Sequence, residues 1–254
     1  MIPLRDDVPS RTFPIVNYCL IGLNVALFLA ELGMGDQIER FFMRATVIPA
    51  LFSGPDRVFE ASDVVSSFTD ADLRTRALLS MFLHGGIAHL LGNMLYLYIF
   101  GDNVEDRCGH FKYLVFYLLC GYIATFAHIA ADPRSRIPSL GASGAIAGVL
   151  GAYMTLFPHA RVVTILPLGF LTQVVQLPAV FFLGFWFLQQ FLLGLVESNA
   201  PRGSGGGGVA WWAHIGGFVA GLVLVWVFQS RKRKPAARDE WWGETSRGRR
   251  VRGW

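Results

Sequence analysis

Residues 141–148 read Gly-Ala-Ser-Gly-Ala-Ile-Ala-Gly, a run of small residues with one serine inside a strongly apolar stretch. Further along the chain, residues 213–217 read Ala-His-Ile-Gly-Gly at the start of a second apolar stretch. Ionisable and strongly polar side chains at membrane depth are costly, and they usually mark a functional site. The two stretches therefore indicate a nucleophile, Ser143, and its base, His214, inside a bilayer.

The composition predicts an integral membrane protein. Of 254 residues, 53% are hydrophobic and only 16% are charged, and the mean hydropathy is +0.44, which is too apolar for a soluble domain. A helix needs about 20 apolar residues to cross a bilayer. Six stretches meet this need, so the predicted fold is an all-α polytopic bundle of six transmembrane helices at residues 14–32, 78–101, 111–131, 140–157, 177–196 and 209–229.

Charge divides the chain into a short N-terminus (1–13), a membrane domain (14–229) and a basic tail (230–254). The tail begins with Arg-Lys-Arg-Lys at 231–234, directly after the last apolar stretch. The positive-inside rule places this tail in the cytoplasm, and six spans place the N-terminus there too. A topology anchor is the favoured role of the tail, and binding to anionic lipid or a nucleic acid is the alternative.

Two connections between the apolar stretches have a distinct character. Residues 41–50 are apolar but too short to span, which is typical of a segment lying in the outer interface. Residues 201–208 are rich in glycine and precede His214, which predicts a mobile lid over its helix. The three cysteines, an odd number, indicate neither a disulfide framework nor a metal cluster.

Small residues recur at helical spacing on the two stretches that carry the serine and the histidine. Such faces let membrane helices touch backbone to backbone, and the same contact would bring the imidazole to the hydroxyl. Packing alone is the competing interpretation of these faces. The small residues are Gly141, Gly144, Gly148 and Ala152 on one stretch and Ala213, Gly217 and Gly221 on the other.

A serine becomes a strong nucleophile when a base within hydrogen-bond reach accepts its proton, and histidine suits this role near neutral pH. The neighbouring sequence offers no acidic third member, so we predict a Ser–His dyad.

Residues 84–93 add three polar side chains to another apolar stretch. On a helix, His89 and Asn93 would share a face, whereas His84 and His89 would diverge by about 140°.

This spacing suits hydrogen-bond donors for an oxyanion better than a zinc pair, which usually has two histidines four apart. No metal or other cofactor is expected. For His84, structural packing and a direct part in the mechanism remain equal alternatives.

Together these motifs, with residues 101–109, resemble the rhomboid intramembrane serine proteases over about residues 14–229. The resemblance implies that Ser143 attacks a peptide bond and that His214 acts as base and then acid. It also implies oxyanion contacts from Asn93, His89 and the backbone of Ser143. Supporting roles fall to Gly141, which keeps the oxyanion pocket open, and to Gly217 and Gly221, which seat the histidine helix.

The sequence departs from familiar members of that family in two places. The aromatic residue that often stacks on the catalytic imidazole is replaced by Ala147, and the first loop has no Trp-Arg pair. The fifth stretch is aromatic around Trp186, which is typical of a substrate gate or of residues facing lipid. Its Gln189 and Gln190 could hydrate an inner path or bond a neighbouring helix.

We therefore predict a serine endopeptidase that cleaves transmembrane segments of membrane proteins near the extracytoplasmic interface. Its partners would be transmembrane substrates and the lipid bilayer, with no nucleic acid. A catalytically silent rhomboid-like protein that binds membrane clients is the alternative, and a transporter is a third class. The compact six-span form favours a bacterial inner membrane with both termini in the cytoplasm. The sequence defines neither the physiological substrate and its cleavage site nor an oligomeric state.

Overall fold

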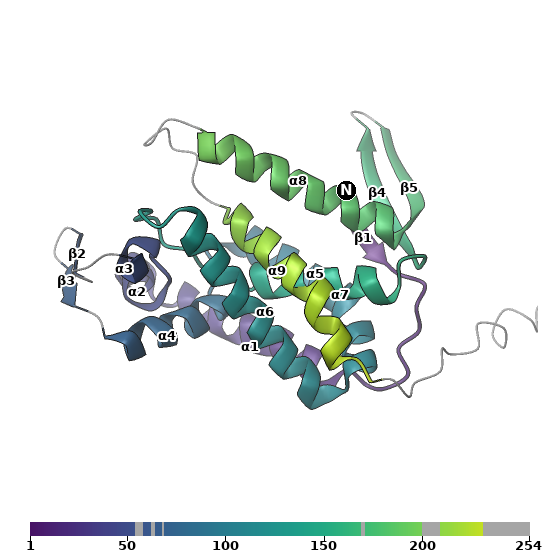
Figure 1. Ribbon diagram of the computed structural model, residues 1–254, viewed down its shortest axis with the longest axis horizontal. Coiled ribbons are helices and arrows are strands. Elements are labelled where there is room, and N and C mark those ends of the chain that lie inside the picture. Colours follow the sequence, from purple (N-terminus) through teal and green to yellow (C-terminus); the bar gives the residue numbers. More distant parts are fainter. Residues whose placement is uncertain (54–57, 62–63, 68, 169–170, 200–208, 231–254) are drawn as a thin grey trace, which may run out of the picture.

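Helices dominate the fold, as the apolar stretches predict (Figure 1). The computed structural model describes residues 1–53, 58–61, 64–67, 69–168, 171–199 and 209–230. The longer helices are α1 (Ile15–Leu32), α5 (Ile87–Cys108), α6 (His110–Ala131), α7 (Ser143–Leu156), α8 (Ala179–Asn199) and α9 (Trp211–Phe228). Shorter helices connect α1 to α5: α2 (Ile38–Ala45), α3 (Pro49–Ser53) and α4 (Asp70–Leu79), with single 3-10 turns at Gly35–Gln37 and Ser80–Phe82. The basic tail and the glycine-rich connection fall on residues 231–254 and 200–208, which lie outside the described residues.

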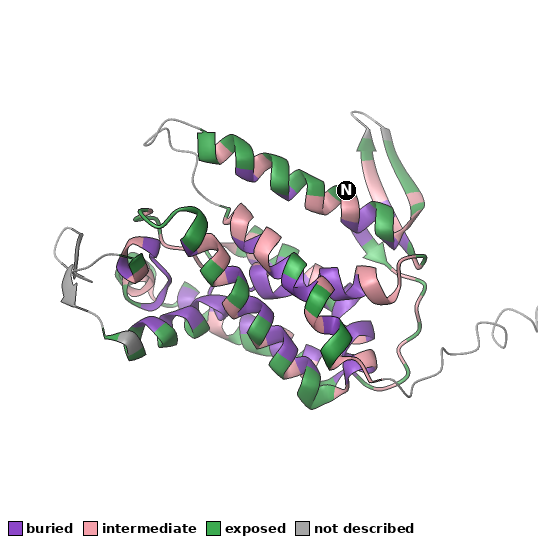
Figure 2. Ribbon diagram, in the orientation of Figure 1, coloured by how far each residue is buried: buried purple, intermediate pink, exposed green. Residues whose placement is uncertain are grey.

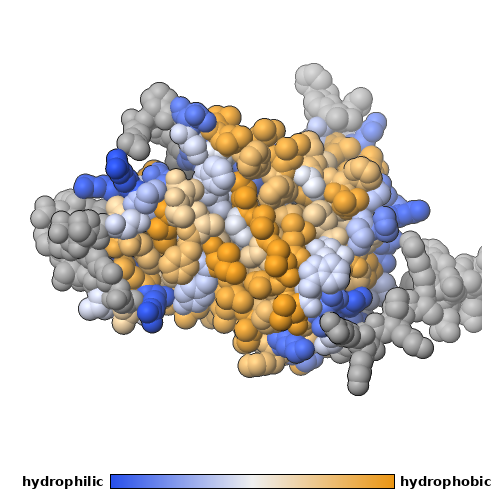
Figure 3. Space-filling model, viewed as in Figure 1, coloured by the Kyte–Doolittle hydropathy of each residue, from blue (hydrophilic) through white to orange (hydrophobic). Residues whose placement is uncertain are grey.

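Four helices within the described ranges, α1, α6, α8 and α9, are long and apolar enough to cross a membrane. A fifth span is possible if residues 71–82 and α5 count as one segment bent by 82°. Figure 3 shows hydrophobic residues in a broad band across the middle of the molecule and hydrophilic residues toward its two ends. This distribution fits a polytopic helical protein in a bilayer.

The second and fourth predicted spans differ from the observed helices. Residues 78–101 do not form one helix, because α4 ends at Leu79 and α5 begins at Ile87, after two glycines that are free to turn the chain. Helix α5 also continues beyond the predicted stretch and ends at Cys108, which is buried. The fourth stretch yields only the 14-residue helix α7, so it is too short to count as a span by length.

The prediction of an all-α fold was wrong in one respect, because the protein also contains strands. Strand β4 (Arg161–Leu168) and strand β5 (Leu171–Pro178) form an antiparallel hairpin between α7 and α8, and β1 (Ile2–Arg5) pairs with β4. A second hairpin joins β2 (Val58–Ala61) to β3 (Val64–Ser67). Residues 161–178 contain several β-branched residues, which favour strands.

The N-terminal segment is held to the bundle by a partly buried carboxyl group just after β1. Asp6 accepts a hydrogen bond from the Tyr153 hydroxyl of α7 and another from the Asn103 amide of α5, at 2.9 Å for the latter. Burial raises the pKa of the Asp6 carboxyl to about 7. The short N-terminal segment is thus fixed to two core helices.

Helix α7 lies at the centre of the bundle and packs against α5, α6 and α9. A side chain on Gly217 or Gly221 would overlap a backbone carbonyl of α7, from Gly144 and Gly148 respectively. The two small-residue faces are therefore in backbone contact, as the spacing predicts. Residues on every side of α7 are buried, which explains how so short and glycine-rich a helix can hold a fixed position (Figure 2).

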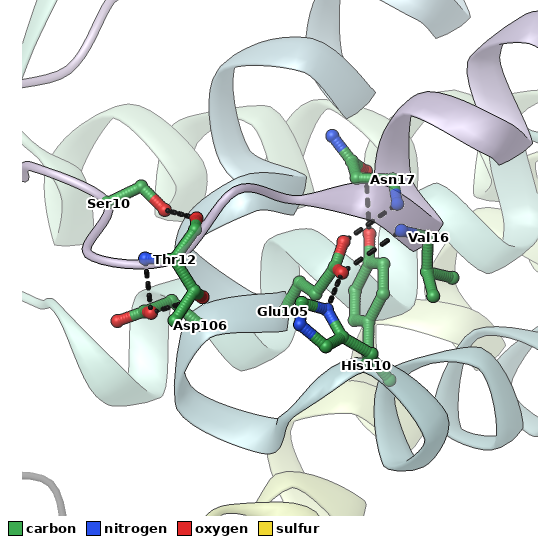
Figure 4. A network of polar contacts seen from close by, with 8 residues as sticks. Ser10, Thr12, Val16, Asn17, Glu105, Asp106 and His110 are labelled. Atoms are coloured by element: carbon green, nitrogen blue, oxygen red, sulfur yellow. Dashed lines mark hydrogen bonds and ion pairs between the residues drawn. The ribbon is translucent and has the colours of Figure 1, made fainter.

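Glu105, near the end of α5, holds the start of α1 (Figure 4). Its carboxyl oxygens accept the backbone N–H groups of Val16 and Asn17 at 3.0 and 2.7 Å, and His110 contacts the same carboxyl group. The first N–H groups of a helix lack acceptors within the helix, and a carboxylate also favours the positive end of the helix dipole. Glu105 thus caps a helix that is distant in sequence.

Glu105→Ala is expected to lower the free energy of unfolding by on the order of 3 kcal/mol, because it leaves buried N–H groups without an acceptor. Thermal unfolding in detergent micelles would measure the loss. The matched control is Glu39→Ala, since Glu39 is exposed on α2. Equal melting temperatures for the two variants would contradict the capping role.

Candidate active site

The structure brings Ser143 and His214 together. Ser143 is the first residue of α7 and His214 lies in the first turn of α9, so the contact between the two helices places both side chains at the same end of the bundle. His214 Nε2 lies 2.7 Å from Ser143 Oγ, within hydrogen-bond distance. The imidazole is thus placed to accept the hydroxyl proton.

The other ring nitrogen of His214 is bonded to helix α8. Its Nδ1 lies 2.8 Å from Gln190 Oε1, and the Gln190 side chain is buried. Trp186, one turn earlier on α8, has its ring centroid 5.8 Å from that of His214, with the two planes inclined at 35°. Trp211 contacts the imidazole edge-on at 6.2 Å. The aromatic contact that is absent at Ala147 comes from other helices.

Gly141 makes room for His89. It has a φ of +129°, which L side chains rarely adopt, and a Cβ there would lie 2.7 Å from His89 Cε1. The N–H of Gly141 donates to the Ser80 carbonyl at 2.8 Å, which fixes the segment before Ser143. Gly141, His89 and Ser143, which the sequence singled out, are thus packed together around the start of α7.

Gly141→Ala is expected to reduce any activity of this site by roughly 10-fold or more, because a methyl group would displace the His89 ring and strain the turn before Ser143. The measurement is the turnover of a transmembrane substrate by the reconstituted variant. Gly22→Ala provides the control, since a Cβ at Gly22 on α1 meets no atom within 4 Å and Gly22 lies outside the lining of the cavity. Activities that match for the two variants would contradict this role for Gly141.

His84 contacts Asn93 rather than pointing away from the site. His84 Nε2 lies 3.0 Å from Asn93 Nδ2, and the two histidine rings, His84 and His89, meet edge-on at 5.2 Å. The expected divergence of 140° between them was wrong, because His84 lies in the loop before α5 and helical spacing does not apply to it. The backbone N–H of His84 in turn donates to Glu31 of α1, at 3.3 Å. His84 therefore orients the Asn93 amide.

The described residues contain no group of three His, Cys, Asp or Glu side chains that could hold a metal ion. The zinc alternative for His84 and His89 therefore has no third ligand in this part of the chain. The two histidines have other neighbours instead, namely the Asn93 amide and the turn at Gly141.

The Ser143 and His214 side chains face a cavity of about 260 Å³. Helices α5, α7, α8 and the start of α9 contribute its walls, including His89, Asn93, Trp186 and Gln190. The backbone N–H of Ser143 belongs to the first turn of α7, whose N–H groups have no acceptor within the helix. A substrate carbonyl placed beside Ser143 Oγ would thus have polar groups of α5 and α7 nearby.

Gln190 is the site residue whose part the sequence did not define. The sequence is compatible with a Gln190 that hydrates an inner path or bonds a neighbouring helix, because nothing in the local pattern says which helix it meets. Trp186 is likewise one of several aromatic residues in the fifth stretch, and the local pattern does not single it out. The available signal was that Trp186 and Gln190 are four apart and so share one face of α8.

The fold and the site together define a multi-pass helical membrane protein with a hydrogen-bonded serine and histidine at an internal cavity. A family model described as "Rhomboid domain" matches residues 73–231, which is more than half of the chain and includes every residue of the site. The chain therefore belongs to the rhomboid family.

Similar proteins come from several lineages. The chain is 28% identical over 233 residues to "Rhomboid protein 1, mitochondrial" of Saccharomyces cerevisiae, covering 88% of this chain and 58% of that protein. It is 29% identical to "RHOMBOID-like protein 4" of Arabidopsis thaliana, and the match covers 86% of this chain and 54% of that protein. It is 34% identical to "Rhomboid protease GluP" of Bacillus subtilis, and the match covers 59% of this chain and 26% of that protein. The chain thus spans little more than half of the first two relatives and about a quarter of the third.

Proposed function

We propose that this protein is an intramembrane serine endopeptidase that cleaves transmembrane segments of membrane proteins. The observation that carries the proposal is the 2.7 Å contact between Ser143 Oγ and His214 Nε2 beside a cavity. A serine hydroxyl is a weak nucleophile until such a base accepts its proton. Membership of a family that includes a protein named a protease supports the same reaction.

The reaction follows the pattern of serine proteases. Ser143 Oγ attacks the carbonyl carbon of the scissile peptide while its proton moves to His214 Nε2. The peptide C–N bond then breaks, and the proton on Nε2 passes to the leaving amine. A water molecule next gives a proton to Nε2 and attacks the acyl-enzyme, which releases the carboxylic acid and restores the serine.

Stabilisation of the oxyanion falls to groups of α5 and α7. We assign it to the N–H of Ser143, the Asn93 amide and the His89 ring, with Gly141 keeping the space open. Hydrogen-bond donors that are fixed before the reaction are worth most in a water-poor site. The contact from His84 holds the Asn93 amide, so we assign His84 to positioning rather than to the chemistry. Gly217 and Gly221 seat α9 on α7.

We propose six spans, with α7 as the fourth, because α7 is shielded by the other helices and need not cross the bilayer alone. Thr12, just before α1, bonds to Asp106, and Ser230, just after α9, bonds to the Arg107 carbonyl, so the start of α1 and the end of α9 both lie at the end of α5. Helices α5, α7 and α9 begin at the opposite end, where Ser143 and His214 lie.

With the basic tail in the cytoplasm, the site then faces the extracytoplasmic side of the membrane. Mitochondrial, plant and bacterial proteins are among the relatives, and the bacterial inner membrane stays a prediction from the compact form of the chain.

A substrate helix has to unwind before it is cleaved, because its peptide groups are bonded within the helix. We therefore expect cleavage near the extracytoplasmic interface, at small or helix-breaking residues. The substrate would enter from the lipid beside α8, whose exposed face carries large apolar side chains such as Phe181 and Phe185. The partners are thus single-span membrane proteins and the bilayer itself.

A fluorophosphonate probe tests the proposal, since it reacts with a serine activated by a base. The full-length protein, reconstituted in liposomes with a panel of single-span substrates, is expected to cleave a substrate and to take up the probe at Ser143. Labelling is expected to disappear in both Ser143→Ala and His214→Ala. If the wild type binds the substrates but neither cleaves them nor takes up the probe, the client-binding alternative holds and the protease is excluded.

A further inference from the structure

We propose that Gln190 of α8 is a positioning residue that holds His214 in the orientation and tautomer needed for catalysis. The site would then be a Ser–His–Gln triad rather than a dyad. This inference rests on the proposed function and adds one residue to that same site.

The two nitrogens of the imidazole have different partners, which defines their protonation. Nε2 lies 2.7 Å from Ser143 Oγ and must be free of a proton in order to accept one. A neutral imidazole then carries its proton on Nδ1, which lies 2.8 Å from Gln190 Oε1. An amide oxygen accepts this hydrogen bond and thereby favours the reactive tautomer over the other.

An amide suits position 190 because the side chain there is buried next to the imidazole. Both Gln190 and His214 are buried, with 5% and 8% of their surfaces exposed. A carboxylate in the same place would add a charge to an apolar environment, which is costly unless it is fully paired. The amide oxygen supplies an acceptor for Nδ1 without that charge. The third member of a protease triad, which is often acidic, can therefore be neutral here.

Helix α8 holds the imidazole at two points. Gln190 bonds its edge, and Trp186, one turn earlier on the same face, lies against the ring at a centroid distance of 5.8 Å. Figure 2 shows that α8 is exposed along most of its outer surface, while the residues facing the bundle are buried or partly buried. The site is therefore shared by α7, α9 and α8, and α8 supplies the support that the absent aromatic at Ala147 would have given.

The test compares two replacements of Gln190 with one of its neighbour. Gln190→Met keeps the size of the side chain but removes the acceptor, whereas Gln190→Glu keeps an acceptor. Gln189→Ala is the matched control, because Gln189 is exposed on α8. Each variant of the full-length protein is reconstituted in liposomes with a single-span substrate. The kcat, the KM, the pH profile of kcat and the melting temperature are then measured.

Gln190→Met is expected to lower kcat by on the order of 10²-fold, with KM changed less than about 3-fold, because His214 loses its tautomer preference but the substrate pocket remains. Gln190→Glu is expected to recover most of this loss. It should also move the acidic limb of the kcat–pH profile to higher pH, since a carboxylate stabilises the protonated imidazole. Gln189→Ala should behave as the wild type.

Cleavage by the wild type tests the proposed protease, and the kcat of the Gln190 variants tests the positioning role separately. A wild type that neither cleaves nor takes up the fluorophosphonate probe overturns the protease itself. A wild type that cleaves, together with Gln190→Met of equal kcat, overturns only the positioning role. The role is also overturned if Gln190→Glu is as impaired as Gln190→Met with an unshifted pH profile. If Gln190→Met does not fold, Gln190→Ala takes its place in the same comparison.

Discussion

Ser143→Ala is expected to lower the cleavage rate of a transmembrane substrate by at least roughly 10³-fold without changing the fold, because it removes the nucleophile and only one oxygen atom. The Ser143 hydroxyl contacts His214 Nε2 but supports no helix by itself. His214→Ala should lower the cleavage rate by a similar factor, since the serine hydroxyl and the imidazole act as a unit. The double variant should be no slower than either single variant. Single-turnover assays in liposomes would measure these rates.

The control for this prediction is Ser139→Ala, a serine close in sequence whose backbone, rather than its hydroxyl, pairs with Val47. It should cleave at the wild-type rate. Melting temperatures of all variants should agree within a few degrees. Cleavage by Ser143→Ala at a rate near that of the wild type would show that another residue is the nucleophile. A large fall in its melting temperature would show that Ser143 has a structural role.

Gly221→Ala is expected to have the largest effect on stability among single methyl additions. A Cβ at Gly221 would overlap the Gly148 carbonyl oxygen and lie 2.6 Å from the Gly148 carbonyl carbon. Both contacts are to backbone, so neither can be relieved by a side-chain rotation. Helices α7 and α9 would have to separate, at a cost on the order of 3 kcal/mol or more. The separation would also pull His214 from Ser143, so proteolysis should be lost.

Thermal unfolding and substrate cleavage, measured on the same preparation, check this prediction. Gly184→Ala is the matched control, because a Cβ at Gly184 on α8 meets no atom within 4 Å. It should melt and cleave as the wild type does. If Gly221→Ala were as stable and active as Gly184→Ala, the result would contradict a close backbone contact between α7 and α9 at Gly221.

The features predicted best from sequence depend on local pattern. Apolar runs located α1, α6, α8 and α9, because residues facing lipid must be apolar whatever the neighbouring helices are. The small-residue faces predicted the contact between α7 and α9 for a similar reason. A glycine with no side chain permits an approach that no other residue allows, so its spacing is informative before the partner is known.

Other features depended on contacts between segments distant in sequence. The break between α4 and α5 brought His84 back to Asn93, which a continuous helix would not allow. Strands β4 and β5 could not be predicted from their apolar character, because buried strands and membrane helices share it. The capping role of Glu105 depends on its contacts with α1, which the motif at residues 101–109 does not indicate.

The composition by itself determined a helical membrane protein, and the motifs determined its resemblance to the rhomboid family. The polar side chains of Ser143 and His214 inside apolar stretches, with small residues spaced along each helix, indicated the candidate catalytic pair, because 3.6 residues per turn relate sequence to a helix face. Only the tertiary structure decided what supports His214, namely Gln190 and Trp186 of α8. That support depends on how two helices are rotated and packed against each other, and the spacing within either helix carries no such information.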